Sequence, residues 1–439
     1  MKNAVIVGSG IAGIVSAKIL SDQGYKIKII EASNNIGGLM SSKIYNNYYF
    51  DHGPHLIQET EKKVINNDLF KNFKKYCHSY KSLPQDSYFN GKWSKSNSFA
   101  NLTNFNKKTF NKIFKEIIQS QSKKKIKFKN AQKYYEYYYG STLTNKLIKP
   151  LVKKYTGYNL KELKAEIGSL FNLKRFIIAS PQITRKLKKN SNLNNVLGFN
   201  NYHEGVSGRK NFYPKSGGIN NILNILIKNK KKKIKILTNC SVQFLKKEND
   251  KIKYLCLSNG KKIYVDKLIW TGGINILSSL LNFKIKKIKK INKYMYWNFF
   301  HYTTNNSIRK KVFYSYNYEK NIPIYRITYY DNFQKKNNHK NKFRMTVEVI
   351  TPKKKDLVKL DGQIKDSLSK MNILTKKNKI NLVDSYDIPY AFEKNLNEKN
   401  PAFNKIKNLN LFGQAVNKFS KEEIIKHIFK TLVYSTKSK

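Results

Sequence analysis

The sequence predicts an α/β protein that combines a Rossmann-type dinucleotide-binding domain with a helical insert and an antiparallel-sheet region. Three observations support this fold class. The pattern of residues 4–31 predicts a strand, a glycine turn, a helix and a second strand. Residues 61–204 have mainly helical periodicity, and residues 276–404 contain the alternation of apolar and polar side chains that is typical of strands. The dinucleotide-binding domain is expected to be discontinuous and to comprise residues 1–60, 205–275 and 405–439.

The first element is a strand–turn–helix unit. The apolar run at residues 4–7 precedes the turn Gly8-Ser9-Gly10-Ile11-Ala12-Gly13, and a helical stretch follows to about residue 24. Glycines in such a turn let the backbone approach a pyrophosphate, and the helix directs its N-terminal N–H groups at that anion. Glu31 ends the next strand, 18 residues after Gly13, where a carboxylate can accept both ribose hydroxyls of an adenosine. A tight turn without a ligand would explain the glycines but leave Glu31 without a role.

A second glycine pair indicates which dinucleotide is bound. Glu31 and Ala32 are followed by Gly37-Gly38 and Leu39, and this stretch resembles the N-terminal signature of FAD-binding flavoproteins of the glutathione-reductase type. In those proteins the extended flavin dinucleotide passes over the second glycine pair. The resemblance therefore implies FAD, bound by Gly8, Ser9, Gly10, Ile11, Ala12, Gly13, Glu31, Ala32, Gly37, Gly38 and Leu39.

The formal net charge of +59 invites a nucleic-acid interpretation, but the kind of basic residue argues against it. Only six of the 86 basic residues are arginines, and the lysines are spread along the whole chain. Specific readers of nucleic acid rely on the bidentate donors of arginine, and no nucleic-acid-binding motif is present. Most lysines are expected on solvated faces. Peripheral association with an anionic membrane surface, or an anionic substrate, stays open.

Cysteine usage and the N-terminus favour a reducing compartment. Cys77, Cys240 and Cys256 are odd in number and have no CxxC spacing, so neither a disulfide framework nor a metal site is indicated. The first strand begins at residue 4, which leaves no cleavable signal sequence, and the apolar residues 4–17 are too few to span a bilayer. We expect a cytoplasmic protein. The sequence does not indicate an oligomeric state.

A second resemblance follows a strand at residues 45–50. Asp51-His52-Gly53-Pro54-His55 resembles a turn of the amine-oxidase, protoporphyrinogen-oxidase and phytoene-desaturase flavoproteins, and especially of UDP-galactopyranose mutases. In the mutases a Gly-Pro-His lies beside the flavin ring, so His55 is the nearest catalytic candidate, although flavin N5 itself carries the chemistry. The second histidine usual in mutases is replaced here within Leu56-Ile57-Gln58. A purely structural turn role for His55 remains the alternative.

Residues 61–204 are expected to form a mainly helical substrate domain, with helices near 107–121, 131–139, 141–154 and 160–179. The chain then returns to the cofactor domain through Pro214-Lys215-Ser216-Gly217-Gly218, which resembles the corresponding segment of these flavoproteins. The resemblance implies that Val242 presents its backbone to the adenine. A hairpin turning at Asn259-Gly260 and a buried strand near 266–271 follow.

The periodicity of residues 293–350 is that of β-strands. The run at 322–333 resembles a sheet segment of UDP-galactopyranose mutases whose arginine binds the pyrophosphate of a sugar nucleotide, and Arg326 matches that arginine. Pairing of Arg326 with Glu348 on a neighbouring strand is the open alternative. Asp387-Ile388-Pro389-Tyr390 resembles the segment that brings a tyrosine to the active site, which implies substrate binding by Tyr390.

The chain is expected to end at the cofactor. A buried strand at 408–413 and a helix at 422–433 resemble the C-terminal elements of the same flavoproteins, in which a glycine and a polar residue contact the ribityl chain. Gly413 matches this pattern. Gln414 departs from it, because amine oxidases have an acid and the mutases an arginine at this position.

The combined expectation is an FAD-dependent oxidoreductase of the amine-oxidase-like superfamily that acts on a small molecule, namely a sugar nucleotide or a glycan-related substrate of polysaccharide biosynthesis. The alternative is an isomerase of the UDP-galactopyranose-mutase type, in which reduced FAD acts as a nucleophile. A basic scaffold that binds nucleic acid or membrane is a remote third hypothesis. No specific nucleic acid is expected as a partner.

Overall fold

The protein is analysed as a computed structural model. The structure describes residues 2–53, 56–95, 97–122, 124, 126–165, 167, 171–201, 203–230, 232–283, 294–334, 342–375, 377–391, 401–416, 418 and 420–434. The chain forms two compact units. The first unit comprises Met1–Ser79, Arg209–Lys289 and Asn395–Lys439, and the second comprises Tyr80–Gly208 and Lys290–Lys394.

A parallel five-stranded sheet forms the centre of the first unit. Its strand order is β10-β2-β1-β14-β20, and the strands span Ile234–Leu237, Lys26–Ile30, Asn3–Val7, Lys267–Trp270 and Leu409–Leu411. The central strand β1 pairs in parallel with both β2 and β14, so that Ile6 lies opposite Ile29 on one side and Ile269 on the other. These three isoleucines are fully buried, as expected for a strand covered on both faces.

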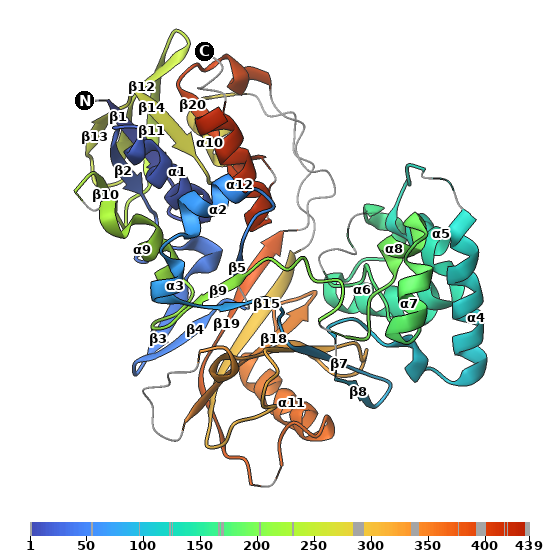
Figure 1. Ribbon diagram of the computed structural model, residues 1–439. Coiled ribbons are helices and arrows are strands. Elements are labelled where there is room, and N and C mark those ends of the chain that lie inside the picture. The colour runs from blue at the N-terminus through green and yellow to red at the C-terminus, as the bar shows by residue number, and fades with distance from the viewer. Residues whose placement is uncertain are drawn as a thin grey trace. The chain divides into compact units, whose positions relative to one another are not determined.

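Helix α1 (Ile11–Asp22) follows β1 directly and is buried along most of its length. It contacts α9 (Asn221–Ile227) and α12 (Lys421–Phe429). Figure 1 shows these three helices with the parallel sheet. The remaining helices of the first unit are α2 (Lys63–Phe70), α3 (Phe73–Tyr76) and α10 (Ile274–Leu280).

Three small sheets complete the first unit. The antiparallel meander β11-β12-β13 spans Val242–Glu248, Lys251–Leu257 and Lys262–Tyr264. The pair β3–β4 spans Ser42–Tyr45 and Tyr48–Asp51, and the sheet β5-β9-β6 spans Ile57–Gln58, Asn211–Pro214 and Cys77–Tyr80. The mixed α/β class predicted from the sequence is confirmed.

The second unit contains a seven-stranded sheet with the order β19-β15-β18-β17-β16-β7-β8. The strands span Ile380–Ala391, Tyr294–Thr304, Phe343–Thr351, Ile324–Tyr329, Tyr314–Asn317, Gln85–Phe89 and Lys92–Ser94. All neighbours are antiparallel except β16 and β7, which pair in parallel. Helix α11 (Leu357–Lys370) packs its apolar side chains against Phe300, Ile327 and Val347 of the sheet.

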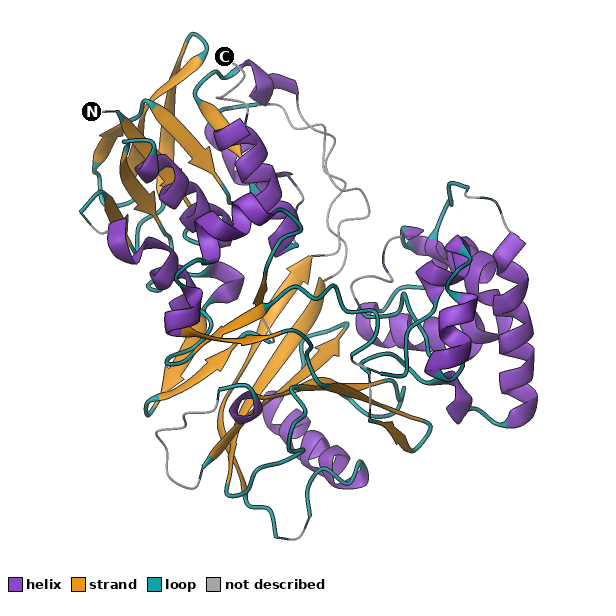
Figure 2. Cartoon of the chain, viewed as in Figure 1, coloured by secondary structure: helices purple, strands orange, loops and turns teal. Residues whose placement is uncertain are grey.

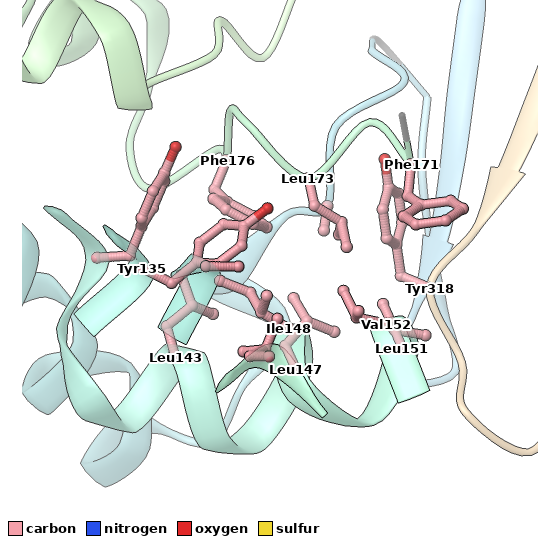
Figure 3. Packing of buried hydrophobic residues seen from close by; sticks show 14 of the residues in the cluster. Tyr135, Leu143, Leu147, Ile148, Leu151, Val152, Phe171, Leu173, Phe176 and Tyr318 are labelled. Atoms are coloured by element: carbon pink, nitrogen blue, oxygen red, sulfur yellow. The ribbon is translucent and has the colours of Figure 1, made fainter. Parts of the chain in front are cut away.

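The helical part of the second unit contains α4 (Lys107–Ile118), α5 (Ala131–Leu143), α6 (Lys149–Thr156), α7 (Pro181–Leu187) and α8 (Ser191–Val196), drawn in purple in Figure 2. Its core is aromatic and aliphatic, and Figure 3 shows Tyr135, Ile148 and Phe176 packed within it. The short 3-10 and π turns of the described chain, four of which lie in this helical part, are η1 (Gly38–Met40), η2 (Leu102–Asn104), η3 (Gln119–Ser122), η4 (Thr144–Ile148), η5 (Leu160–Glu162), η7 (Lys228–Lys230), η8 (Tyr330–Asn332), η9 (Pro401–Lys405), η10 (Gly413–Val416) and η11 (Lys430–Tyr434).

The helix predicted at 160–179 is wrong. Leu160–Glu162 forms a 3-10 turn, closed by a capping box between Asn159 and Glu162, and the described residues 171–179 are not helical. Farther on, Phe176 and Ile177 form bridges to Leu197 and Asn101. The apolar residues that suggested a helix are buried by these longer-range contacts instead of by a helical face.

Within the described part of the chain, no helix combines the length and the apolar character that crossing a bilayer requires.

Candidate cofactor-binding site

The turn between β1 and α1 contains two glycines, Gly8 and Gly13, that the packing of the protein requires, because a side chain at either position would clash. A Cβ added at Gly13 would lie 1.9 Å from the carbonyl oxygen of Gly8, and one added at Gly8 would lie 2.2 Å from Oγ1 of Thr271. Gly8 also has a φ of +99°, which other residues rarely adopt. These two glycines therefore let α1 and the end of β14 pack closely against the turn.

Gly10 and Gly38 are different, because a Cβ at either position would clash with no described atom, although Gly38 has a φ of +55°, which itself favours glycine. The nearest described atom to a Cβ at Gly10 is the carbonyl oxygen of Gly37, at 3.7 Å, and a Cβ at Gly38 would lie 3.7 Å from Cα of Gly10. Gly10 has an extended backbone with φ −67° and ψ −177° at the N-cap of α1, which an alanine also adopts. The bare backbone at these two positions forms a cradle at the start of a 12-residue helix, suited to close approach of an anion.

A hydrogen-bond network joins the turn to the end of β2. The backbone N–H and the hydroxyl of Ser9 both donate to Oε2 of Glu31, at 2.9 and 2.6 Å, and those of Ser33 both donate to Oε1, at 2.9 and 2.8 Å. Gly37 N–H donates to Oγ of Ser9 at 3.3 Å. Partial burial would raise the pKa of Glu31, but the Ser9 and Ser33 donors outweigh it and hold that pKa below its ordinary value. The carboxylate is therefore ionised at neutral pH.

The structure brings two later predicted positions to the same end of the parallel sheet. A Cβ at Gly413 would lie 3.2 Å from Cβ of Ala12 in the first turn of α1. The segment before Val242 reaches Glu31, whose carbonyl oxygen accepts the N–H of Cys240 at 2.9 Å. Val242 itself is buried, and it packs in a core that includes Val5 and Ile30.

The other predicted residues of this region differ in exposure. Ile11 and Ala12 are buried in α1, whereas Ala32, Leu39 and Gln414 are exposed. Leu39 is 67% exposed, which is high for a leucine in a folded domain. His55, together with Pro54, lies outside the described residues, so its predicted place beside a flavin stays a prediction.

Asp51 belongs to the turn motif named in the sequence, but the sequence analysis assigned no role to it. Its Oδ1 accepts the hydroxyl of Ser42 at 2.7 Å and the N–H of Ile219 at 3.0 Å, and its Oδ2 accepts the hydroxyl of Tyr213 at 2.7 Å. Asp51 is only 1% exposed, so these three donors compensate a carboxylate removed from water. Its position at the end of an apolar strand, directly before the glycine turn, was the available signal.

His52 follows Asp51 and is neutral at physiological pH. Burial, with the positive charge of Lys43 added, lowers the pKa of His52 to about 4.

Arg326 of the second unit forms a bidentate ion pair with Glu348. Its Nε and Nη2 donate to the two carboxylate oxygens at 2.7 Å each, and Nη1 donates to the hydroxyl of Tyr316 at 3.3 Å. Trp297 Nε1 donates to the same carboxylate at 2.7 Å. Burial alone would lower the pKa of Arg326, but the Glu348 carboxylate raises it well above its ordinary value. The structure thus contains the ion pair that the sequence left open.

The face of the seven-stranded sheet that carries Arg326 also carries a polar network. Nδ1 of His301 lies 2.8 Å from Oγ1 of Thr346, and Nε2 lies 3.2 Å from the hydroxyl of Tyr386. The hydroxyl of Tyr330 lies 2.8 Å from the same Thr346 oxygen. Tyr390 lies on β19 of this sheet and is 37% exposed. The sequence analysis missed His301, because its role depends on partners 45 and 85 residues away.

Comparison with known families gives one match over most of the chain. Residues 11–326 match the model of the family described as flavin containing amine oxidoreductase. Two individual relatives match over shorter stretches. A 1-hydroxycarotenoid 3,4-desaturase of Flavobacterium sp. (strain P99-3) is 33% identical over 177 residues, which cover 38% of this chain and 32% of that protein.

The second relative is a 4,4'-diapophytoene desaturase (4,4'-diaponeurosporene-forming) of Staphylococcus aureus (strain COL), 33% identical over 88 residues that cover 20% of this chain. The matched stretches span only 32% and 17% of the lengths of the two desaturases. Among solved structures, that of reduced UDP-galactopyranose mutase superposes with a TM-score of 0.75 at 17% identity, covering 100% of this chain and 96% of that chain. At this identity the likeness concerns the fold alone.

Proposed function

This chain belongs to the family of flavin containing amine oxidoreductases, whose cofactor is FAD, and we propose that it is an FAD-dependent oxidoreductase with its cofactor in the first unit. The observation that carries the proposal is the cradle at Gly10 and Gly38, and within it Gly10, where neither the packing of the described residues nor the backbone conformation requires a glycine. A pyrophosphate that needs the backbone to come close explains the glycine at position 10.

The residues of the first unit fit FAD. The N–H groups at the start of α1 would face the pyrophosphate, and Glu31 would accept the ribose hydroxyls. Each oxygen of that carboxylate has two donors within hydrogen-bond distance, so a ribose hydroxyl must replace one of them, and the single hydrogen of the Ser33 hydroxyl can turn to the carbonyl oxygen of Asn35, 2.6 Å away. Ser33 is exposed while Ser9 is fully buried, so the Ser33 hydroxyl is the one to yield. The narrower assignment to the glutathione-reductase type of FAD domain is part of this proposal. When bound, FAD supplies an isoalloxazine ring that accepts a hydride from a carbon atom of the substrate.

The second unit favours a net oxidation of a substrate that carries no pyrophosphate. Arg326 is the arginine expected to bind that group, and its charge is already neutralised by Glu348 through two hydrogen bonds of 2.7 Å. The aromatic side chains of Trp297, Tyr316 and Tyr325 surround the ion pair. One of the relatives named above is a 1-hydroxycarotenoid 3,4-desaturase, and we extend to this chain the removal of hydrogen from an apolar substrate.

A sugar-nucleotide or glycan-related substrate, including the mutase reaction, is the second candidate. The observation that favours it is the partial accessibility of the Arg326 guanidinium. The side chain is 15% exposed, and Nη1 donates to the hydroxyl of Tyr316 at the longer distance of 3.3 Å. A ligand phosphate would compete with that tyrosine for Nη1.

Two measurements test the proposal. The purified protein should carry stoichiometric, non-covalent FAD, and anaerobic addition of its substrate should bleach the flavin absorbance. Failure of the folded protein to take up FAD would refute the cofactor assignment. UDP should then be titrated against the wild type and Arg326→Lys. Equal affinity, or no binding, supports the oxidation, whereas a loss of about tenfold or more in Arg326→Lys supports a pyrophosphate-bearing substrate.

A further inference from the structure

The outer face of the meander β11-β12-β13 carries an ordered array of aromatic and basic side chains. One cross-strand row is Lys246, Tyr254 and Tyr264, and the next is Phe244, Cys256 and Lys262. The rings touch across the strands: the Phe244 and Tyr254 centroids are 6.3 Å apart, and the Tyr254 and Tyr264 centroids 5.7 Å. We call these six residues the meander patch.

The meander patch is a solvent-facing surface. The opposite face of the same three strands is its buried side, formed by Leu245, Ile252, Leu255, Leu257 and Ile263. On the patch itself, Phe244 is 47% and Tyr264 60% exposed. These two exposed rings each contact Tyr254, and a contiguous exposed aromatic surface of this kind marks an interaction site.

The charges around the meander patch select an anionic occupant. Lys246 and Lys262 are exposed within it, and the whole chain has a formal net charge of +59. The neighbouring carboxylate of Glu248 is paired with Lys253 at 2.7 Å, so it does not offset the patch lysines. We propose that the meander patch binds the headgroup region of an anionic lipid bilayer.

The ring geometry favours lipid over single-stranded nucleic acid. Bases bind such a sheet by stacking on open ring faces. Here Nζ of Lys262 lies 3.9 Å from the Tyr254 centroid and covers that face, and the rings of Tyr254 and Tyr264 meet edge to face at 63°. Amphipathic rings beside lysines suit a bilayer interface, where the ring bodies enter the headgroup layer and the ammonium groups attract anionic lipids.

Binding is tested with the full chain by vesicle co-sedimentation at about 0.15 M salt. Vesicles with about one third phosphatidylserine should bind, and pure phosphatidylcholine vesicles should bind far less. Lys246→Gln with Lys262→Gln should weaken binding about fivefold per lysine. Lys359→Gln with Lys370→Gln on α11 removes the same charge from exposed positions and should leave the affinity nearly unchanged.

The aromatic contribution needs its own variants. Phe244→Ser with Tyr264→Ser should weaken binding at least tenfold without changing the charge or the thermal unfolding temperature. A tryptophan reporter then locates the contact: the fluorescence of Tyr264→Trp should be quenched by brominated lipids, and that of Val358→Trp, at an 83% exposed position of α11, should not.

Several outcomes would overturn the proposal. These are no binding to anionic vesicles, equal losses in the two lysine double variants, or equal quenching of both reporters. A single-stranded oligonucleotide could instead displace the protein from the vesicles. If its binding also requires Phe244 and Tyr264, the meander patch would be assigned to nucleic acid. A dimer that dissociates in Phe244→Ser with Tyr264→Ser would assign it to a second copy of the chain.

Discussion

Ser9 donates both its backbone N–H and its hydroxyl hydrogen to a single oxygen of the Glu31 carboxylate, at 2.9 and 2.6 Å. The glycine turn and the second strand are therefore fixed to each other before any ligand arrives. The carboxylate is ionised and oriented, which lowers the ordering cost of binding a ribose.

This relationship predicts unequal effects for the two serines that bind Glu31. Ser9→Ala removes a buried donor to a charged acceptor, so we expect FAD affinity to fall about tenfold, equivalent to about 1.4 kcal/mol. Ser33→Ala removes an exposed donor that the ribose replaces, and affinity should change less than about threefold. Titration of FAD into the apoproteins measures both. Equal losses in the two variants would contradict the proposed exchange at Ser33.

Gly10→Ala tests the cradle. Because a Cβ at Gly10 meets nothing described closer than 3.7 Å, the variant should fold with an unchanged thermal unfolding temperature in the apo form. Its FAD content should nevertheless drop sharply, since the Cβ occupies the space that the pyrophosphate needs. Gly362→Ala, where a Cβ meets no atom within 4 Å, is the matched control and should keep its FAD.

Gly13→Ala should behave differently from Gly10→Ala. Its Cβ would lie 1.9 Å from the Gly8 carbonyl oxygen, so folding itself should suffer. If Gly10→Ala also failed to fold, the division of the turn into packing glycines and a ligand-facing glycine would be wrong.

Glu348→Gln tests the buried ion pair of the second unit. The variant leaves the charge of Arg326 without its partner in a position that is 15% exposed, and we expect the free energy of unfolding to fall by about 3 kcal/mol. Glu423→Gln, at an exposed carboxylate of α12, should change it by less than about 0.5 kcal/mol. Urea unfolding with FAD present measures both. A change of similar size in the two variants would contradict a structural role for the pair.

Lys154 should give the stability a pH dependence. Its Nζ donates to the carbonyl oxygens of Glu319 and Ile322 at 3.1 and 2.5 Å, and desolvation lowers its pKa from 10.5 to about 7 despite the Glu319 carboxylate nearby. Between these two pKa values the unfolded chain binds a proton that the folded chain does not. The contribution of Lys154 to the free energy of unfolding is therefore full above about 10.5 and is lost as the pH falls to about 7.

The measurement is urea unfolding of the wild type and Lys154→Met between pH 7 and pH 10. The stability of the wild type relative to the variant should rise with pH, by at most about 1.4 kcal/mol per pH unit. Lys153→Met, at the exposed neighbouring position, is the control and should show no such trend. A flat difference for Lys154→Met would mean that its ammonium stays charged in the folded protein.

The sequence alone predicts the arrangement of residues whose contacts are close together in the chain. Gly8, Gly13 and Glu31 lie within one strand–helix–strand unit, so their spacing alone predicts their arrangement. Asp51 could not be found in this way, because its partners Tyr213 and Ile219 lie 162 and 168 residues away. The pairing of Arg326 stayed open for a related reason: it depends on the register between β17 and β18, which the alternation of residues does not specify.

The arginines illustrate the same limit. In a chain that uses lysine almost everywhere, five of the six arginines form ion pairs with a carboxylate, namely Arg185, Arg209, Arg309, Arg326 and Arg344. Arg175 instead donates to the carbonyl oxygens of Asn194 and Leu197. The scarcity of arginine marked these positions as special. Apart from Glu348, which the sequence offered as an alternative partner of Arg326, it did not indicate which carboxylates pair with these arginines, because no sequence pattern links an arginine to a distant carboxylate.

The strand order β10-β2-β1-β14-β20 also constrains how the protein is made. Strand β1 is synthesised first, but its neighbour β14 begins at Lys267 and the edge strand β20 at Leu409. At about 5–20 residues per second, roughly 20 to 80 seconds separate the synthesis of β1 and β20. During that time the apolar surface of β1 and α1 lacks its final cover, since α12 is made later still. The parallel sheet of the cofactor-binding unit is therefore complete only after β20 has been made, and its first strand waits longest for its full set of neighbours.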